Sequence, residues 1–459
     1  MRNYRLRGVT AAALTALAVC LVNPTASAAG PAQGSAPDNW SPPVVFEPER
    51  SNSLGNLAGG PDDQAAVAWT SDGRVLVARR LPGGEWESDT LFDSDKGRDV
   101  RIQYDGQGML HAVWAVVQDA GNGDGPSRLE TATWSPGVGW SPASIIASKQ
   151  IGVFRGLDLE VSRGGDAVLV WEWISHEFAR IMIMSRSDEG WSPPVRLTRG
   201  FEGTGYDAAI GPTGDAVVAL ASCEEKAQTS TRVVVRRRPP GGSWSRPQVL
   251  SQAGGADDCR FTGNWTPGLS SALTSDGVAH VLWAEPGPDG RWRPWTSSAR
   301  RGVRWSRPRS LTRSGAGISI LSLAVGGRGG RSATAVWGRL DGRVDAARFG
   351  PRGGWAQPVR LAGPAPTAVS DLVLGTTWGS TAVVAWTRTN SRDHAGDSWV
   401  VHRGAGPWTR PLRISPKKAL SLSAAVTARP GEDALVAWVQ RQGQLVAPLF
   451  VRTSDSAPG

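Results

Sequence analysis

The feature that most constrains the fold of this chain is an internal repeat. A Trp followed two or three residues later by Pro recurs seven times, and one further Trp fits the same slot without the Pro. The eight Trp span 368 residues in seven intervals, a mean spacing near 53. They are Trp40, Trp86, Trp140, Trp191, Trp244, Trp305, Trp355 and Trp408.

A second motif lies between these Trp. It is a short run rich in Ala and Val that ends in a large apolar residue, which is Trp in seven cases and Leu in one. The end residues are Trp69, Trp114, Trp171, Leu220, Trp283, Trp337, Trp386 and Trp438. Because two different motifs occur the same number of times, we predict eight structural units.

Each unit is typical of four short strands. Residues 206–250 contain the apolar runs YDAAI, DAVVAL, RVVVRRR and WSRPQVL, separated by GPTG, a polar loop and PPGG. Runs of this length bounded by Gly, Pro and Asp indicate strands and turns. Four-stranded units in radial array are typical of a β-propeller, whereas a 53-residue unit buries too little surface to fold alone. We predict an all-β, closed propeller of eight blades, with seven as the alternative.

The two ends of the repeat predict how the ring closes. The chain after its leader begins with a lone fourth strand at Trp40–Phe46, and it ends with three strands at 421–427, 434–439 and 445–451. One strand and three strands complete a blade, so the N-terminal strand should pair into the last blade. We therefore assign residues 39–452 to the propeller and 453–459 to a C-terminal tail.

The first 28 residues have the pattern of an export signal. Basic residues in Met1–Arg7 precede an apolar run at 9–22 and a small-residue cleavage site at 26–28. About 14 apolar residues fall short of the roughly 20 that span a bilayer, so we expect no membrane span. Residues 29–38 are interpreted as a flexible leader, and the mature protein as secreted and extracellular.

The repeat divides the 22 Trp into two classes. Fifteen occupy repeat positions, and a residue that every blade needs is best explained as packing between blades. Seven lie outside these positions, and exposed aromatic faces can contact sugars or apolar partners. The seven are Trp134, Trp173, Trp265, Trp292, Trp295, Trp378 and Trp399.

Loop lengths indicate which face of the propeller binds a ligand. The turns between strands 1 and 2 and between strands 3 and 4 are short, whereas the loops at the opposite face are long and irregular. The long loops of blades 3 to 5 hold four of the unassigned Trp. We predict ligand contacts from Trp173, Trp265, Trp292 and Trp295.

Two acids accompany these Trp. Glu172 and Glu285 follow the second-strand Trp of blades 3 and 5, and we interpret them as equivalent ligand contacts. Glycoside cleavage needs two carboxylates, so they are also the weak catalytic candidates. The alternative is that they are solvated strand-end charges or partners of Arg.

Cys223 and Cys259 fall in neighbouring long loops around blade 4. In an exported chain, two Cys on one face of one blade favour a disulfide, with free buried thiols as the alternative.

The bladed units, in which a Gly-rich turn runs into Trp, resemble the sialidase-type (Asp-box) β-propeller superfamily over nearly the whole chain after the leader. The stretch most similar to the Asp-box, Ser-x-Asp-x-Gly-x-Thr-Trp, is 187–191, which is shorter and lacks the Thr. The active enzymes of this family use a Tyr nucleophile with a Glu and bind a carboxylate with three Arg. The resemblance therefore implies Tyr206 with nearby Glu202, because Tyr104 adjoins the short-turn face.

Signals for other chemistry are weak. We expect no cofactor and no metal site, with calcium at the oxygen-rich loop 119–125 as the alternative. The net charge of +9 comes without a long basic run, so we expect no nucleic-acid partner. We predict a monomeric binding module that recognises glycan or an extracellular protein. The alternative is a glycan-cleaving hydrolase that uses carboxylates of the same face.

Overall fold

The computed structural model describes most of Asn39–Gly459. The described residues are 40–47, 52–81, 84–118, 125–175, 178–198, 205–223, 231–251, 268–287, 289–312, 317–326, 330–350, 353–376, 381–389, 396–404, 406–415, 419–426, 434–440 and 449–454. None of them forms a helix long and apolar enough to cross a membrane.

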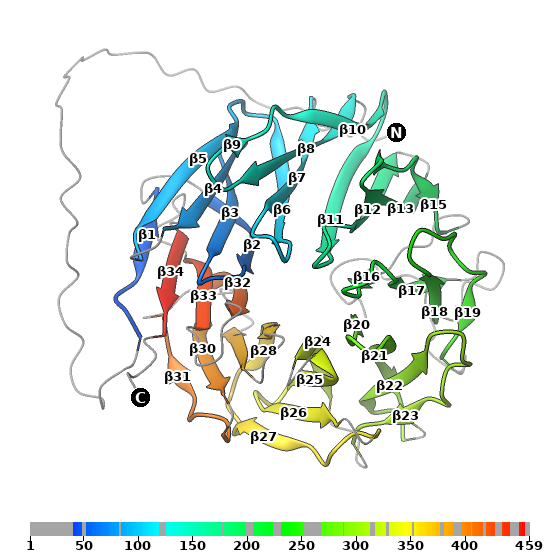
Figure 1. The fold of residues 1–459 in the computed structure, drawn as a ribbon. Coiled ribbons are helices and arrows are strands. Elements are labelled where there is room, and N and C mark those ends of the chain that lie inside the picture. The colour runs from blue at the N-terminus through cyan, green and yellow to red at the C-terminus, as the bar shows by residue number, and fades with distance from the viewer. Residues whose placement is uncertain are drawn as a thin grey trace, which may run out of the picture. The chain divides into compact units, whose positions relative to one another are not determined.

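The described residues form an all-β ring of eight four-stranded antiparallel blades (Figure 1). We number the blades in chain order and give their strands from first to fourth. Blade 1 contains β2 (Asn52–Gly59), β3 (Ala65–Ser71), β4 (Arg74–Arg80) and β5 (Trp86–Phe92). Blade 2 contains β6 (Gly97–Tyr104), β7 (Leu110–Val117), β8 (Ser127–Ser135) and β10 (Ser144–Lys149). Blade 3 contains β11 (Val153–Val161), β12 (Ala167–Ser175), β13 (Phe178–Ser187) and β15 (Val195–Arg196). Short strands β9 (Gly139–Trp140) and β14 (Gly190–Trp191) also pair with the third strands of blades 2 and 3.

The remaining blades repeat this order. Blades 4 and 5 contain β16 (Gly205–Ile210), β17 (Ala216–Cys223), β18 (Thr231–Arg238) and β19 (Gln248–Val249), then β20 (Leu269–Leu273), β21 (Val278–Pro286), β22 (Trp292–Arg300) and β23 (Arg309–Ser310). Blades 6 and 7 contain β24 (Ile318–Gly326), β25 (Ser332–Arg339), β26 (Val344–Phe349) and β27 (Val359–Ala362), then β28 (Ala368–Thr376), β29 (Ala382–Thr389), β30 (Gly396–Arg403) and β31 (Leu412–Arg413). Blade 8 contains β32 (Ala419–Val426), β33 (Ala434–Gln440), β34 (Leu449–Thr453) and β1 (Val44–Phe46).

Blade 8 closes the ring as the sequence predicts. β1 pairs antiparallel with β34, with Phe46 opposite Leu449 and Val44 opposite Val451. An isolated bridge joins Trp40 to Ser454, so pairing extends beyond Val451. The first strand of blade 8 lies against that of blade 1, and the first strands of every other neighbouring pair of blades are also in contact. The predicted eight-bladed closed propeller is therefore confirmed.

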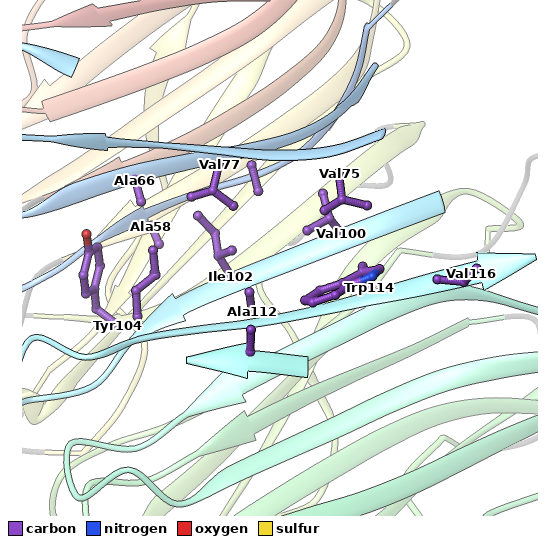
Figure 2. Packing of buried hydrophobic residues seen from close by; sticks show 13 residues of the cluster. Ala58, Ala66, Val75, Val77, Val100, Ile102, Tyr104, Ala112, Trp114 and Val116 are labelled. Atoms are coloured by element: carbon purple, nitrogen blue, oxygen red, sulfur yellow. The ribbon is translucent and has the colours of Figure 1, made fainter. Parts of the chain in front are cut away.

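The second-strand Trp form the core between blades. All seven are only 0–1% exposed. Trp114 of β7 lies in the interface with blade 1, in one cluster with Ala66, Val75 and Val77 (Figure 2). Since strand residues alternate between two faces, each of these seven blades offers a large indole to the preceding blade and small side chains to the following one.

Blade 4 shows that this fit is conserved when the Trp is absent. Leu220 fills the Trp position, and the third strand of blade 3 places Ile181 and Ile183 in the same cluster. At the equivalent place blade 1 has the smaller Val75 and Val77. The larger aliphatic groups compensate for the smaller side chain, because a void in a packed interface costs contact energy.

The residue after the fourth-strand Trp has its own role. In six blades this residue is a Ser or Thr whose hydroxyl accepts a hydrogen bond of 3.0–3.1 Å from a third-strand N–H. Written with the N–H donor first, the pairs are Thr133–Ser141, Ser185–Ser192, Arg237–Ser245, Ser298–Ser306, His402–Thr409 and Thr453–Ser41. The hydroxyl therefore accepts a third-strand N–H that has no partner in the fourth strand. The Pro that follows suits this outer edge strand because it has no N–H of its own.

Deleting residues 39–47 should remove the fourth strand of blade 8 and leave β34 as an open edge. We expect a lower melting temperature and concentration-dependent aggregation, because an unpaired edge is a template for pairing between chains. Calorimetry and light scattering measure both effects. Deletion of residues 29–38 is the control and should change neither. Unchanged melting and solubility after the first deletion would contradict the role of β1 in closure.

Candidate functional site

The antiparallel blades present two faces. The short 1–2 and 3–4 turns lie at one, and the 2–3 and 4–1 loops, which we call the long-loop face, lie at the other. Much of the long-loop face falls outside the described residues. The residues that the structure does not describe include Trp265, Cys259, Glu202 and residues 119–124 of the oxygen-rich loop. Cys223 ends β17, and its bridge to Cys259 stays a prediction.

The described part of the long-loop face contains a charged and aromatic cluster at blade 3, which we call the Trp173 cluster. Trp173 near the end of β12 is partly exposed, with Lys149 Nζ 4.7 Å and Arg180 Cζ 5.4 Å from its ring centroid. On the opposite face of blade 3, toward Tyr206, Arg155 Nε donates a 2.9 Å hydrogen bond to Glu172 Oε2. The Arg155 side chain is 63% exposed, so this ion pair is at the surface.

The chain around Trp173 is held closely. The indole Nε1 donates to the carbonyl of Ile151 at 3.1 Å, and Ser127 Oγ donates to the carbonyl of Gly152 at 2.7 Å. A Cβ on Gly152 would lie 2.4 Å from the Trp173 Nε1. Only glycine allows the 4–1 loop to pass this near the indole. The aromatic ring therefore has a defined position at the boundary of blades 2 and 3.

Glu172 and Glu285 do not occupy equivalent positions, contrary to the interpretation from sequence. Glu172 is one residue after Trp171, whereas Glu285 is two residues after Trp283. Because side chains alternate along a strand, the two acids point to opposite faces of their blades. Glu285 Oε2 accepts a 2.8 Å hydrogen bond from Trp283 Nε1, and burial raises the pKa of Glu285 although this bond lowers it.

The predicted Trp are distributed over several blade interfaces. Trp292 packs against the cluster shared by blades 5 and 6, and Trp295 against that shared by blades 4 and 5. Trp295 Nε1 donates to the carbonyl of Glu285 at 3.2 Å. Trp173 belongs to the cluster of blades 2 and 3. The structure therefore separates these three Trp rather than combining them into one surface.

Tyr206 ties blade 4 to blade 3. Its hydroxyl donates to the carbonyl of Gly156, and it lies 3.4 Å from the carbonyl of Arg155. Gly156 has φ +63°, and a Cβ there would meet the Tyr206 hydroxyl. Burial, together with the charge of Glu172, raises the pKa of Tyr206 above its usual range. A phenol that is harder to ionise is a weaker nucleophile.

The inner strands carry polar side chains that link neighbouring blades around the axis. In five successive pairs of blades, a side-chain oxygen of one inner strand accepts a backbone N–H from the next. Written with the side-chain acceptor first, the pairs are Asn56–Ile102, Asp99–Leu157, Asp158–Ala208, Asp207–Ser271 and Ser270–Leu323. This belt satisfies strand donors that face the channel.

Carboxylates concentrate where the belt passes blades 3 and 4. Burial raises the pKa of Asp158 to about 6, although Arg101 and the Ala208 N–H act in the opposite direction. Burial, together with the charges of Asp158 and Asp207, raises the pKa of Glu160. Burial and Asp158 likewise raise the pKa of Asp207. Three like charges in a partly desolvated channel therefore repel one another.

Glu160 also lines a cavity of about 680 Å³ around the axis, at the short-turn ends of the inner strands. Its wall also includes the polar side chains of Asn56, Gln103, Asp105, Gln107, Arg163 and Ser271. Sequence reasoning missed this group. The available signal was the occurrence of acids at 158, 160 and 207 within predicted first strands, which line the channel of a propeller.

No known protein family matches the sequence, and no curated protein matches it. Among solved structures, the BP39L lectin from Burkholderia pseudomallei is 15% identical, with a TM-score of 0.48 and coverage of 79% of this chain and 99% of that chain. The Dos1 propeller is 10% identical, with a TM-score of 0.48 and coverage of 90% and 96%. The Hadza microbial sialidase Hz136 is 10% identical, with a TM-score of 0.42 and coverage of 84% and 73%.

The channel carboxylates should make stability depend on pH. Their folded-state pKa values are raised, so the folded state binds more protons, and the free energy of unfolding should fall as pH rises through these values. Glu160→Gln removes one repelling charge. We expect it to raise stability at pH 8 and to make the free energy of unfolding less dependent on pH, because the amide neither carries the charge nor titrates. Urea unfolding at several pH values measures this.

Glu189→Gln, in an exposed 3–4 turn, is the control and should keep the wild-type slope. Measurement above pH 7 avoids the titration of His280, whose pKa burial lowers to about 4. At lower pH this histidine makes the free energy of unfolding rise with pH, which is opposite to the effect of the acids. A loss of stability at pH 8 in Glu160→Gln would contradict the repulsion.

Proposed function

We propose that this chain is a glycan-binding propeller whose ligand site is the Trp173 cluster. The observation that carries the proposal is the convergence of two basic side chains, Lys149 and Arg180, on one partly exposed indole outside the repeat. Lys149 comes from β10 of blade 2, and Arg180 comes from β13 of blade 3. An aromatic surface flanked by a few placed polar groups is the usual composition of a small-ligand site.

The charge of the cluster favours an acidic sugar. Lys149 and Arg180 beside the indole carry a formal charge of about +2 at neutral pH. Arginine and lysine can hold a carboxylate or sulfate group by charge-assisted hydrogen bonds. The indole offers an apolar surface to the sugar ring. The ligand class is therefore a glycan that carries a uronic, sialic or sulfated residue.

Three observations support binding rather than cleavage. The Tyr206 hydroxyl is engaged with backbone carbonyls, and its pKa is raised. Glu172 is paired with Arg155. Glu285 is hydrogen-bonded to Trp283 and points to the other face of its own blade. A pair of carboxylates on either side of one glycosidic bond requires a different arrangement.

The place of action is part of the same proposal. The export pattern in residues 1–28 supports a protein that meets its ligand outside the cell.

Trp173→Ala should weaken the binding of acidic glycans while the fold stays intact. We expect a cost of about 1–3 kcal/mol in binding free energy, as for other aromatic hot spots. The test is calorimetric titration with 3′-sialyllactose, digalacturonic acid and a heparin oligosaccharide, with lactose as the neutral partner. Affinity for the acidic members should exceed that for lactose and decrease with salt.

The matched control is Trp386→Ala, because Trp386 is fully buried between blades. It should lower the free energy of unfolding by about 3–5 kcal/mol. The proposal is wrong if Trp173→Ala destabilises the protein equally, or if lactose binds as well as 3′-sialyllactose. Hydrolysis of any of these glycans that Glu172→Gln and Glu285→Gln abolish would replace binding with catalysis.

A further inference from the structure

A second group of charged and aromatic side chains lies at the outer edge of the interface between blades 1 and 2, which we call the rim groove. Arg79 comes from β4, and Glu87 and Asp89 come from β5. Trp134 comes from β8, and Trp140 from β9. β5 and β9 lie near each other at the periphery of the ring in Figure 1, and the Trp140–Asp89 hydrogen bond joins them. None of these residues belongs to the Trp173 cluster.

The contacts within the rim groove are specific. Arg79 Nη2 donates to Glu87 Oε2 at 2.7 Å and to Asp89 Oδ2 at 2.9 Å, and Arg79 Nε donates to Asp89 Oδ2 at 3.0 Å. Trp140 Nε1 donates to the same Asp89 oxygen at 3.1 Å. The Arg79 Cζ lies 4.4 Å from the centroid of the Trp134 ring. Two blades therefore contribute to one network.

This network arises where blade 1 departs from the repeat. Seven units place Ser, Thr or Ala directly after the fourth-strand Trp and Pro within three residues of it, whereas blade 1 has Trp86-Glu-Ser-Asp89. β5 consequently pairs with β4 over almost its whole length, and Glu87 and Asp89 lie on the face that carries Arg79. Trp134 is one of the seven Trp outside the repeat positions. Blade packing in the other units uses none of these acids.

The rim groove retains unused hydrogen-bonding capacity at a partly exposed site. Among the described contacts, the network uses one oxygen of each carboxylate and two of the three guanidinium nitrogens. Glu87 is 53% exposed and Asp89 28%, whereas Arg79 is 9% exposed. Fixed donors and acceptors beside an indole match the vicinal hydroxyls and apolar face of a sugar ring.

We propose that the rim groove is a second ligand site and that it binds a neutral sugar. Arg79, Glu87 and Asp89 would hydrogen-bond to hydroxyls, and Trp134 and Trp140 would contact the apolar face of the sugar. The formal charge of the three ionised groups is −1, so the groove disfavours the acidic glycans proposed for the Trp173 cluster. This proposal does not depend on that cluster.

The test uses the full chain after its leader and the methyl glycosides of glucose, galactose, mannose, fucose and N-acetylglucosamine. Binding is followed by ligand-observed NMR and by Trp fluorescence. We expect at least one glycoside to bind with Kd in the millimolar range, as single-sugar sites commonly do. Trp134→Ala should raise this Kd about tenfold or more, and Glu87→Gln, at an exposed side chain, should raise it about fivefold or more without a change in melting temperature.

Trp408→Ala is the matched control. Trp408 is a partly exposed fourth-strand Trp with the Arg403 Cζ 5.9 Å from its ring, but Thr409 and Pro411 stand where blade 1 has acids. The Trp408→Ala substitution should leave the affinity for the glycoside unchanged. The proposal is overturned if no glycoside binds, if Trp408→Ala weakens binding as much as Trp134→Ala, or if Glu87→Gln has no effect. Loss of neutral-sugar binding in Trp173→Ala instead would assign the sugar to the other cluster.

Discussion

The insertion of a second-strand indole between neighbouring blades is the interaction on which the rest of this structure depends. Each blade must present a large side chain to one neighbour and small ones to the other, because an interface packs densely only when volumes are complementary. Trp114 against Ala66 and Val75 shows the common arrangement, and Leu220 against Ile183 shows the compensated one. Since the blades form a closed ring, every blade meets both requirements at once.

Closure of the ring links the packing between blades to the pairing of the outer strands. β1 completes the fourth position of blade 8, and Phe46 joins the cluster that surrounds Trp69 of blade 1. The chain end thereby supplies both a strand and a core side chain. In six blades the Ser or Thr after the fourth-strand Trp then satisfies a third-strand donor at the rim, where the outer strand is short. The scaffold is uniform because these demands recur in each blade.

Both proposed sites lie where single blades depart from that uniform scaffold. Trp173 adds an indole to blade 3 beyond the repeat, and β5 exchanges the usual Ser and Pro for Glu87 and Asp89. The channel acids are a third departure, and we expect their ionisation to lower stability because like charges repel in a partly desolvated space. A rigid ring tolerates such groups because the many blade interfaces supply most of its stability. Two sites of opposite charge on one ring would allow a mixed glycan to be held at two points.

The sequence by itself determined the strand order, the number of blades and the closing strand, because each follows from motifs that act within one unit or between units adjacent in sequence. It also separated the structural Trp171 and Trp386 from the unassigned Trp173. Glu172 and Glu285 were wrongly taken as equivalent, although the sequence itself places Glu172 one residue after Trp171 and Glu285 two residues after Trp283. Only the tertiary structure brought Arg79 to Trp134, and Asp158 to Asp207, because blade packing joins residues some 50 positions apart. A one-residue difference in register reverses a side chain, and no local pattern records which distant side chain it then meets.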